Sequence, residues 1–245
     1  MKTENLESLQ KNLKYLGFGE LANEALKSEL STGKESFKID LNIKPVSPDL
    51  KEDQSVKYSL AFTKSKTADH YYLNSYTAQL TGNDIKDQKE QNFALHNGNG
   101  ITSKEAFNLL AGRAVNKDII NKADENVNVW IKLNTAEGGP DKNYYNKNYG
   151  FDLNKVVDNL NAKFTENFTR ESVIKSLEKG NLQSVFVKND SLPEQVYIAA
   201  NPQYKKLDIF DKDLKPVFIK VENLNTNQKP WEGGENAEKK TGVSR

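Results

Sequence analysis

The sequence predicts an α+β protein, with antiparallel sheets and helices packed on one side of them. Apolar residues recur at three- and four-residue steps in the first 33 residues, and at two-residue steps in the segments that follow. Three times a leucine precedes a glycine by three residues where a helical pattern ends and a strand-like one begins, at Leu30–Gly33, Leu109–Gly112 and Leu177–Gly180. Short connections between the alternating segments favour antiparallel pairing.

Residues 1–96 are expected to form an N-terminal αα-hairpin followed by an antiparallel β-meander. The Gly17-Phe18-Gly19 break separates two apolar helical stripes, since glycine tolerates the positive φ that ends a helix. Alternation then predicts strands at residues 37–43, 56–62 and 72–80. The polar residues 83–92 predict a loop, and residues 93–96 a short strand.

Residues 97–222 are expected to form two helix-plus-β-hairpin units. Thr102 and Glu105 have the spacing of a capping box, in front of a helix that ends at Gly112. A strand at 127–133, a loop at 136–150 and a helix at 151–164 follow. Thr169 opens the next helix, which ends at Gly180, and the remaining strands are predicted at residues 184–188, 195–199 and in a hairpin over 207–221.

The segments 102–115 and 169–185 match each other and indicate an internal helix–glycine–hairpin repeat. The alternative is chance, because glycine commonly ends helices and leucine is a common helix residue. Apolar residues nearly vanish after residue 222, so residues 223–245 are expected to be a disordered tail.

Composition excludes several classes of chemistry. The chain has 245 residues and no cysteine, so it has neither disulfides nor thiolate metal sites nor cysteine nucleophiles. Its formal net charge is +1, which supplies no global attraction to nucleic acid or anionic lipid. No apolar run reaches the roughly 20 residues of a membrane-spanning helix, and the polar N-terminus lacks a signal sequence. A cytoplasmic protein without cofactor or membrane partner is expected.

One candidate ligand site is the glycine turn formed by Asn97, Gly98, Gly100, Thr102 and Ser103. A strand, a glycine turn and a helix N-terminus can hold a phosphate, because free backbone N–H groups and the helix dipole point at one place. The run has neither a third glycine nor the Gly-Lys-Ser/Thr of a P-loop. The alternative is a turn before a well-capped helix.

A second candidate is a nucleic-acid-binding loop formed by Lys142, Tyr144, Tyr145, Lys147 and Tyr149. Tyrosine rings stack on bases and lysines contact phosphates, which is the chemistry of single-strand binding. The alternative is that tyrosines favour strands and are buried there.

Neither a metal site nor a catalytic site is predicted. Asp208, Asp211 and Asp213 lie close together in sequence, but the sixth position of an EF-hand loop counted from Asp211 is Pro216 where glycine is required. Two histidines are too few for a zinc site, and no Ser/His/Asp arrangement is evident.

Five segments resemble a group of uncharacterised proteins from Bacteroidota genomes, often found with conjugative elements and a topoisomerase nearby. They are LKYLGFGE (13–20), GNGITSKEAFNLLAGRAVNK (98–117), NYGFDL (148–153), LEKGNLQSV (177–185) and ANPQY (200–204). The resemblance covers roughly residues 5 to 220 and implies an accessory role in mobile-element DNA transfer or processing. It identifies no site residues.

Together these observations predict a non-enzymatic binding or adaptor protein with a protein partner. Direct binding of single-stranded nucleic acid through the Tyr/Lys loop is one alternative. A phosphate-handling enzyme at residues 97–103 is the other.

Overall fold

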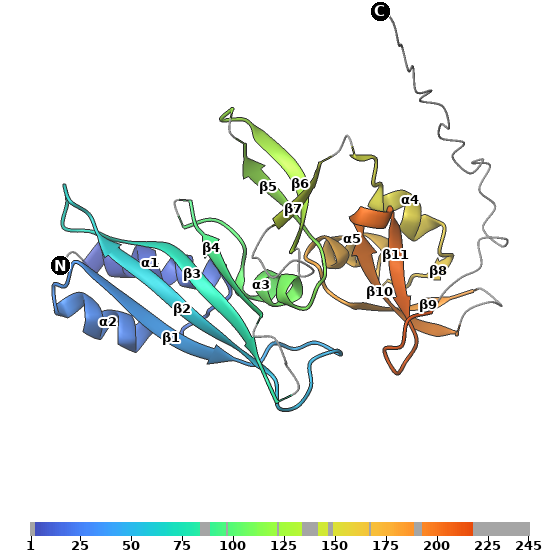
Figure 1. Ribbon diagram of the computed structural model, residues 1–245, viewed down its shortest axis with the longest axis horizontal. Helices are drawn as coiled ribbons and strands as arrows, with labels where there is room; N and C mark the ends of the chain where they lie inside the picture. The colour runs from blue at the N-terminus through green and yellow to red at the C-terminus, as the bar shows by residue number, and fades with distance from the viewer. Residues whose placement is uncertain are drawn as a thin grey trace, which may run out of the picture.

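The computed structural model has the predicted α+β class, with antiparallel sheets and helices packed against them (Figure 1). It describes residues 3–217 apart from residues 84–88, 97, 122, 134–141, 147–148, 167 and 189–192, with the backbone alone at 142–146. The tail predicted at 223–245 lies outside the described residues.

The N-terminal part is the predicted αα-hairpin and meander. Its elements are α1 (Thr3–Tyr15), α2 (Asn23–Ser31), β1 (Ser36–Ile43), β2 (Ser55–Lys64), β3 (Tyr71–Thr81) and β4 (Lys89–Ala94), and the strands pair in the order β1-β2-β3-β4. The loop predicted at 83–92 is wrong from residue 89 onward, because β4 begins there. Gln91 takes a buried position in β4 where an apolar residue would have signalled a strand.

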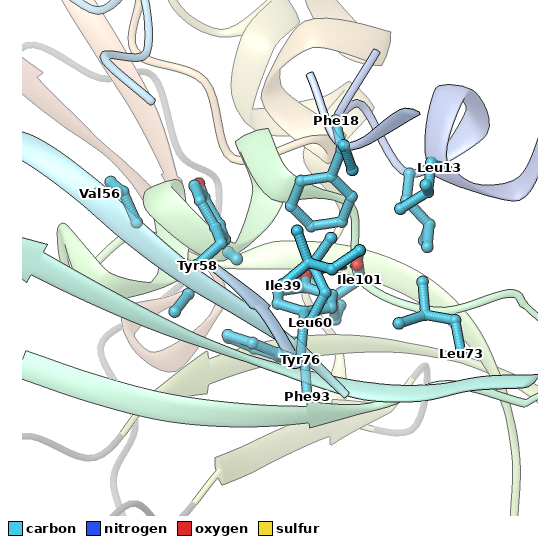
Figure 2. Close-up of a cluster of buried hydrophobic side chains, with 14 of the residues drawn as sticks. Leu13, Phe18, Ile39, Val56, Tyr58, Leu60, Leu73, Tyr76, Phe93 and Ile101 are labelled. Atoms are coloured by element: carbon cyan, nitrogen blue, oxygen red, sulfur yellow. Dashed lines mark hydrogen bonds between the residues drawn. The ribbon is translucent and has the colours of Figure 1, made fainter. Parts of the chain in front are cut away.

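One face of this sheet packs against the helices and forms the larger core. Phe18, from the turn after α1, meets the rings of Tyr58 and Tyr76 edge-on, with both pairs of centroids 5.2 Å apart. Figure 2 shows these rings with Leu13, Ile101 and the inward residues of the strands. Edge-to-face contacts of this kind add stability beyond the burial of the rings.

A second, smaller sheet follows α3 (Ser103–Leu110) and consists of β5 (Val115–Ile120), β6 (Asn126–Leu133) and β7 (Lys142–Asn146). β5 lies where the sequence pattern was irregular, and β7 lies inside the predicted loop 136–150, which is wrong for these five residues. Their Asn, Lys and Tyr composition resembles a loop, whereas the pairing with β6 makes them a strand.

The C-terminal part carries the third sheet. Its elements are α4 (Leu153–Asp158), β8 (Ala162–Lys163), α5 (Arg170–Glu178), β9 (Gln183–Val187), β10 (Gln195–Asn201) and β11 (Lys206–Phe210), with the strands in the order β11-β10-β9-β8. The helix predicted at 151–164 is wrong beyond α4, because Asn161 has a left-handed φ of 53° and β8 follows it. The amide of Val217 donates to the Ile209 carbonyl, so the predicted final hairpin begins as expected. Residues 218–221 lie outside the described residues.

Buried side chains form two cores, and neither core ends at residue 97, where two subdomains were expected to meet. Val129, Ile131 and Leu133 of β6 belong to the larger core, together with residues of α1 and of β1 to β4. Trp130, on the opposite face of β6, belongs to the core of the C-terminal part. The small sheet therefore lies between the two cores, as Figure 1 also shows.

Of the three predicted helix ends that precede a strand, those at Gly112 and Gly180 meet each other at this junction. After α3 the amides of Gly112 and Arg113 donate to the Leu109 and Asn108 carbonyls, and after α5 those of Gly180 and Asn181 donate to Leu177 and Ser176. Both ends are thus Schellman caps. Thr102 and Thr169 cap the helix starts as predicted. A shared origin of the two segments stays a prediction.

A buried arginine connects the two parts. The Arg113 guanidinium donates from Nε to the Gly180 carbonyl at 2.7 Å, from Nη2 to Asn108 Oδ1 at 2.7 Å, and from Nη1 to Asp49. The Asn108 amide in turn donates to the Lys179 carbonyl at 2.7 Å. These bonds satisfy the carbonyls of the two residues that follow α5, so the junction is specified by hydrogen bonds as well as by apolar contact.

Candidate nucleic-acid interface

The C-terminal sheet has one face against helices and one face without them. Residues of β8 to β11 that point inward pack with α4 and α5: Ala162, Val185, Val187, Val196, Ile198, Ala200, Leu207 and Ile209. The alternating residues point to the opposite side.

Three aromatic side chains lie on the outward side. They are Phe186 in β9, Tyr197 in β10 and Phe210 in β11, and we call this surface, together with Lys163, Ser184, Gln195, Lys206 and Asp208, the aromatic face. Tyr197 is paired directly with Phe210 on one side and with Ser184 on the other, while Phe186 lies two residues beyond Ser184 in β9 and pairs with Gln195. Side chains at such positions are neighbours on the sheet.

The rings of the aromatic face differ in exposure. Phe186 is 48% exposed, and Tyr197 and Phe210 are half-buried. Within the part of the chain that the structure describes, no other ring stacks on them, and the Tyr197 hydroxyl has no hydrogen-bond partner. Single exposed apolar residues are ordinary, whereas aromatic residues on three adjacent strands of one face make this surface a candidate site.

Lysines lie at both sides of the aromatic face. Lys163 pairs with Phe186 across β8 and β9, and its Nζ is 3.4 Å from Glu194. Lys206, at the start of β11, has its Nζ 3.6 Å from Asp208. Both pairs are exposed, and exposed ion pairs contribute little, so either ammonium can turn toward a phosphate at small cost.

The outward face of the N-terminal sheet provides a comparison. It carries a shallow hollow of about 450 Å³ lined by polar side chains such as Asp40, Lys57 and Glu90. Tyr72 is the aromatic residue on the outward side there, and it is 53% exposed. A polar outward face is the usual state of an antiparallel sheet, so the three rings of the aromatic face depart from that pattern.

The predicted phosphate site is used by the fold itself. The Thr102 amide donates to the Glu105 carboxylate at 2.8 Å, the Ser103 amide to the Leu16 carbonyl at 2.8 Å, and the Glu105 amide to the Thr102 hydroxyl at 3.4 Å. Donors that a phosphate would require are therefore already bonded, and a carboxylate lies beside them.

The same turn places its other predicted residues in structural roles. The Ser103 hydroxyl donates to the Gly17 carbonyl at 3.0 Å, and the Tyr58 and Tyr76 hydroxyls donate to carbonyls of residues 101–103. Gly98 has a φ of 76° between the bridged residues His96 and Asn99, and Gly100 follows it. Asn97 lies outside the described residues. We interpret this turn as a structural element that holds the αα-hairpin against the start of α3.

The predicted Tyr/Lys loop is only partly described. Lys142, Tyr144 and Tyr145 belong to β7, and their side chains lie outside the described residues, as does Lys147. Tyr149 is described and is 38% exposed. Its hydroxyl donates to the Gln203 carbonyl at 2.8 Å, which joins it to the turn between β10 and β11.

Sequence reasoning missed all three rings of the aromatic face. Each lies within an apolar run, at Val185-Phe186-Val187, at Val196-Tyr197-Ile198 and at Ile209-Phe210. A large apolar residue out of phase with the buried positions of a one-sided strand was the available signal. It is weak alone, because a strand buried on both faces has the same pattern.

The buried groups with shifted pKa values belong to the N-terminal part and the junction, and burial is the main cause of each shift. Burial raises the pKa of the Tyr58 hydroxyl and that of Tyr76 well above the ordinary value. Burial and the neighbouring Arg113 lower the pKa of Lys104 to about 8. Among the described residues no three His, Asp or Glu side chains gather as a metal site would require.

Comparisons with known proteins identify no relative. Over the described residues, no helix has both the length and the apolar character needed to cross a membrane. The resemblance to Bacteroidota proteins of mobile elements stays a prediction. No protein-family model matches the sequence, no curated protein matches it, and no solved structure matches the fold.

Proposed function

We propose that this protein binds single-stranded nucleic acid on the aromatic face and has no catalytic role of its own. The observation that carries the proposal is the presence of Phe186, Tyr197 and Phe210 on the helix-free side of a four-stranded antiparallel sheet. Bases stack on exposed aromatic rings whatever their identity, and four-stranded sheets that bind single-stranded RNA use rings in this way.

The balanced charge of the chain favours stacking over electrostatic attraction as the main source of affinity. Lys163 and Lys206 beside the rings would neutralise about two phosphates and would together contribute about −1.4 to the slope of log affinity against log salt. A cytoplasmic role beside mobile-element DNA transfer or processing, which the resemblance implies, is compatible with such a module and is part of the proposal.

The test is fluorescence anisotropy with a labelled oligothymidine of about twelve nucleotides at low salt. The wild-type chain is compared with the triple variant Phe186→Ala, Tyr197→Ala, Phe210→Ala. Since each stacked base contributes about 1–3 kcal/mol, the triple variant is expected to bind about 100-fold more weakly or worse. Tyr72→Ala removes a ring of the N-terminal sheet that is about as exposed as Phe186, and this variant is expected to bind within about twofold of wild type.

Thermal denaturation of both variants shows that any loss is not due to unfolding. The proposal fails if wild-type protein binds neither DNA nor RNA single strands at low salt. It also fails if the triple variant, still folded, binds as tightly as wild type. If the same face captures a protein and binds no nucleic acid, the adaptor role replaces the proposal of nucleic-acid binding.

A further inference from the structure

Two further tyrosines, Tyr204 and Tyr149, lie at the turn between β10 and β11. Tyr204 is 65% exposed, and Lys206 Nζ lies 5.9 Å from the centroid of its ring. Lys205 Nζ lies 5.0 Å from the centroid of Tyr149, whose hydroxyl bonds to Gln203. Because Lys206 is part of the aromatic face, Tyr204 extends that surface past the ends of β10 and β11, and Tyr149 lies beside the same turn.

The turn is rigidly built. Asn201 is buried, accepts a hydrogen bond from the Tyr204 amide at 3.3 Å, and donates one to Asp208 at 2.8 Å. These bonds close the 3-10 turn Pro202–Tyr204 and attach it to β11. A ligand that reaches the turn therefore finds Lys205 and Tyr204 already in place, which lowers the entropic cost of binding.

Lys205 has a backbone conformation that lysine rarely adopts. Its φ of 53° and ψ of 40° are left-handed, where glycine or asparagine is usual after a helical turn. Asp124, Asn161 and Leu214 also have a positive φ, so this conformation does not by itself mark a site. It matters for the test, because glycine can adopt the same backbone without the side chain.

The charge of Lys205 is also less compensated than that of its neighbours. Lys163 and Lys206 each lie within 4 Å of a carboxylate, whereas no described carboxylate makes an ion pair with Lys205. Its ammonium instead lies over the Tyr149 ring, close to Gly150. An exposed cation–π contact is weak and leaves the ammonium free to meet an anion.

We infer that Lys205 binds a backbone phosphate of a single strand that leaves the aromatic face past Tyr204 and Tyr149. The inference rests on the proposed function and adds the direction in which the strand leaves the sheet. The phosphate would accept hydrogen bonds from the Lys205 ammonium, and the flanking base would stack on Tyr204.

The variant that tests it is Lys205→Gly. Glycine accepts the left-handed backbone, so the variant is expected to fold with an unchanged or higher melting temperature, while losing the ammonium. For an oligothymidine of about twelve nucleotides, we expect about fivefold weaker binding and a salt slope shallower by about 0.7. Lys66→Gly makes the same charge change in a turn of the N-terminal sheet and is expected to bind as wild type does.

A shorter oligothymidine, of about four nucleotides, tests the path of the strand. It should be held by the aromatic face alone, so wild type and Lys205→Gly are expected to bind it equally. Equal binding of the long strand by both proteins, with the same salt slope, overturns the inference. If the triple ring variant still loses binding, the proposed function stands. A wild-type protein that binds neither strand overturns both.

Discussion

Lys104 is half-buried beside a second cation, and its position makes stability depend on pH. Its Nζ lies 4.7 Å from the centroid of the Phe107 ring, and the Arg113 guanidinium lies 5.2 Å from the same centroid. The ammonium donates to the Val46 carbonyl, and Asp49 partly offsets the two positive charges. Burial, and then repulsion by Arg113, lower the pKa of Lys104 to about 8.

This lowered pKa predicts that stability rises between about pH 8 and pH 10. The unfolded chain holds the proton with an ordinary lysine pKa near 10.4, so in that window it binds more protons than the folded chain, and the free energy of unfolding rises with pH. Below about pH 8 both states are protonated and the penalty is fully present. The variant Lys104→Met keeps the apolar stem and is expected to be about 1 kcal/mol more stable at pH 7, after allowance for partial exposure.

Urea denaturation at pH 7, 8 and 9 measures this effect. Lys104→Met should lose most of the rise that wild type has over these values. A wild-type stability that is flat or falling over the window, or a methionine variant with the same slope, contradicts the account. Measurements stop near pH 9.5 because Tyr58 and Tyr76 have raised pKa values, so unfolded tyrosines release protons above about pH 10 and lower stability there.

At the scale of elements, the end of α5 packs directly against the end of α3. A side chain at Gly180 would place its Cβ 2.7 Å from the Ala114 carbonyl oxygen and 2.9 Å from Val115 Cγ2. Gly112 occupies the matching position after α3, also with positive φ, but nothing lies within 4 Å of its Cβ position. The two glycines thus share a conformation and differ in contact.

We therefore expect Gly180→Ala to destabilise the protein more than Gly112→Ala. The control bears only the cost of a left-handed alanine, about 1–2 kcal/mol. The test variant bears that cost and an overpacked contact, together about 2–4 kcal/mol. Urea denaturation of both variants gives the comparison, and equal losses would show that the two helix ends do not meet as described.

Elements with strong periodicity were predictable from sequence, and those decided by partners were not. β1 to β3 follow from alternation, and the caps at Thr102 and Thr169 follow from residue type and spacing. β4 and β7 are strands because a neighbour supplies the hydrogen bonds, and their polar composition conceals this. Asn161 ended a helix that the apolar pattern would have continued.

The candidate site was less predictable, because it depends on register. Phe186, Tyr197 and Phe210 are far apart in sequence, and they become neighbours only when β9, β10 and β11 pair as they do. Tyr149 was singled out from the sequence, but its partners Gln203 and Lys205 were not, because nothing in the sequence places residue 149 beside residue 205. The sequence therefore showed which residue types are present, but it did not show which of them become neighbours in the fold.

At the scale of the whole molecule, the small sheet and Arg113 join the two cores, and the aromatic face points away from the helices α4 and α5. Arg113 connects the loop at Asp49, the end of α3 and the Gly180 carbonyl after α5, and the small sheet packs on both cores. The helices α4 and α5 occupy the inner side of the C-terminal sheet. The arrangement fixes the C-terminal sheet to the rest of the protein through its helix side and leaves the ring side without a covering helix.

Photocrosslinking tests the central claim most directly. A single strand of bromouridine is irradiated with the wild-type chain, and the crosslinked tryptic peptides are identified by mass spectrometry. We expect crosslinks in the peptides 180–188, 189–205 and 207–212, which contain Phe186, Tyr197 with Tyr204, and Phe210. Crosslinks confined to other peptides, such as those of the N-terminal sheet, or a complete absence of crosslinks, would contradict binding on the aromatic face.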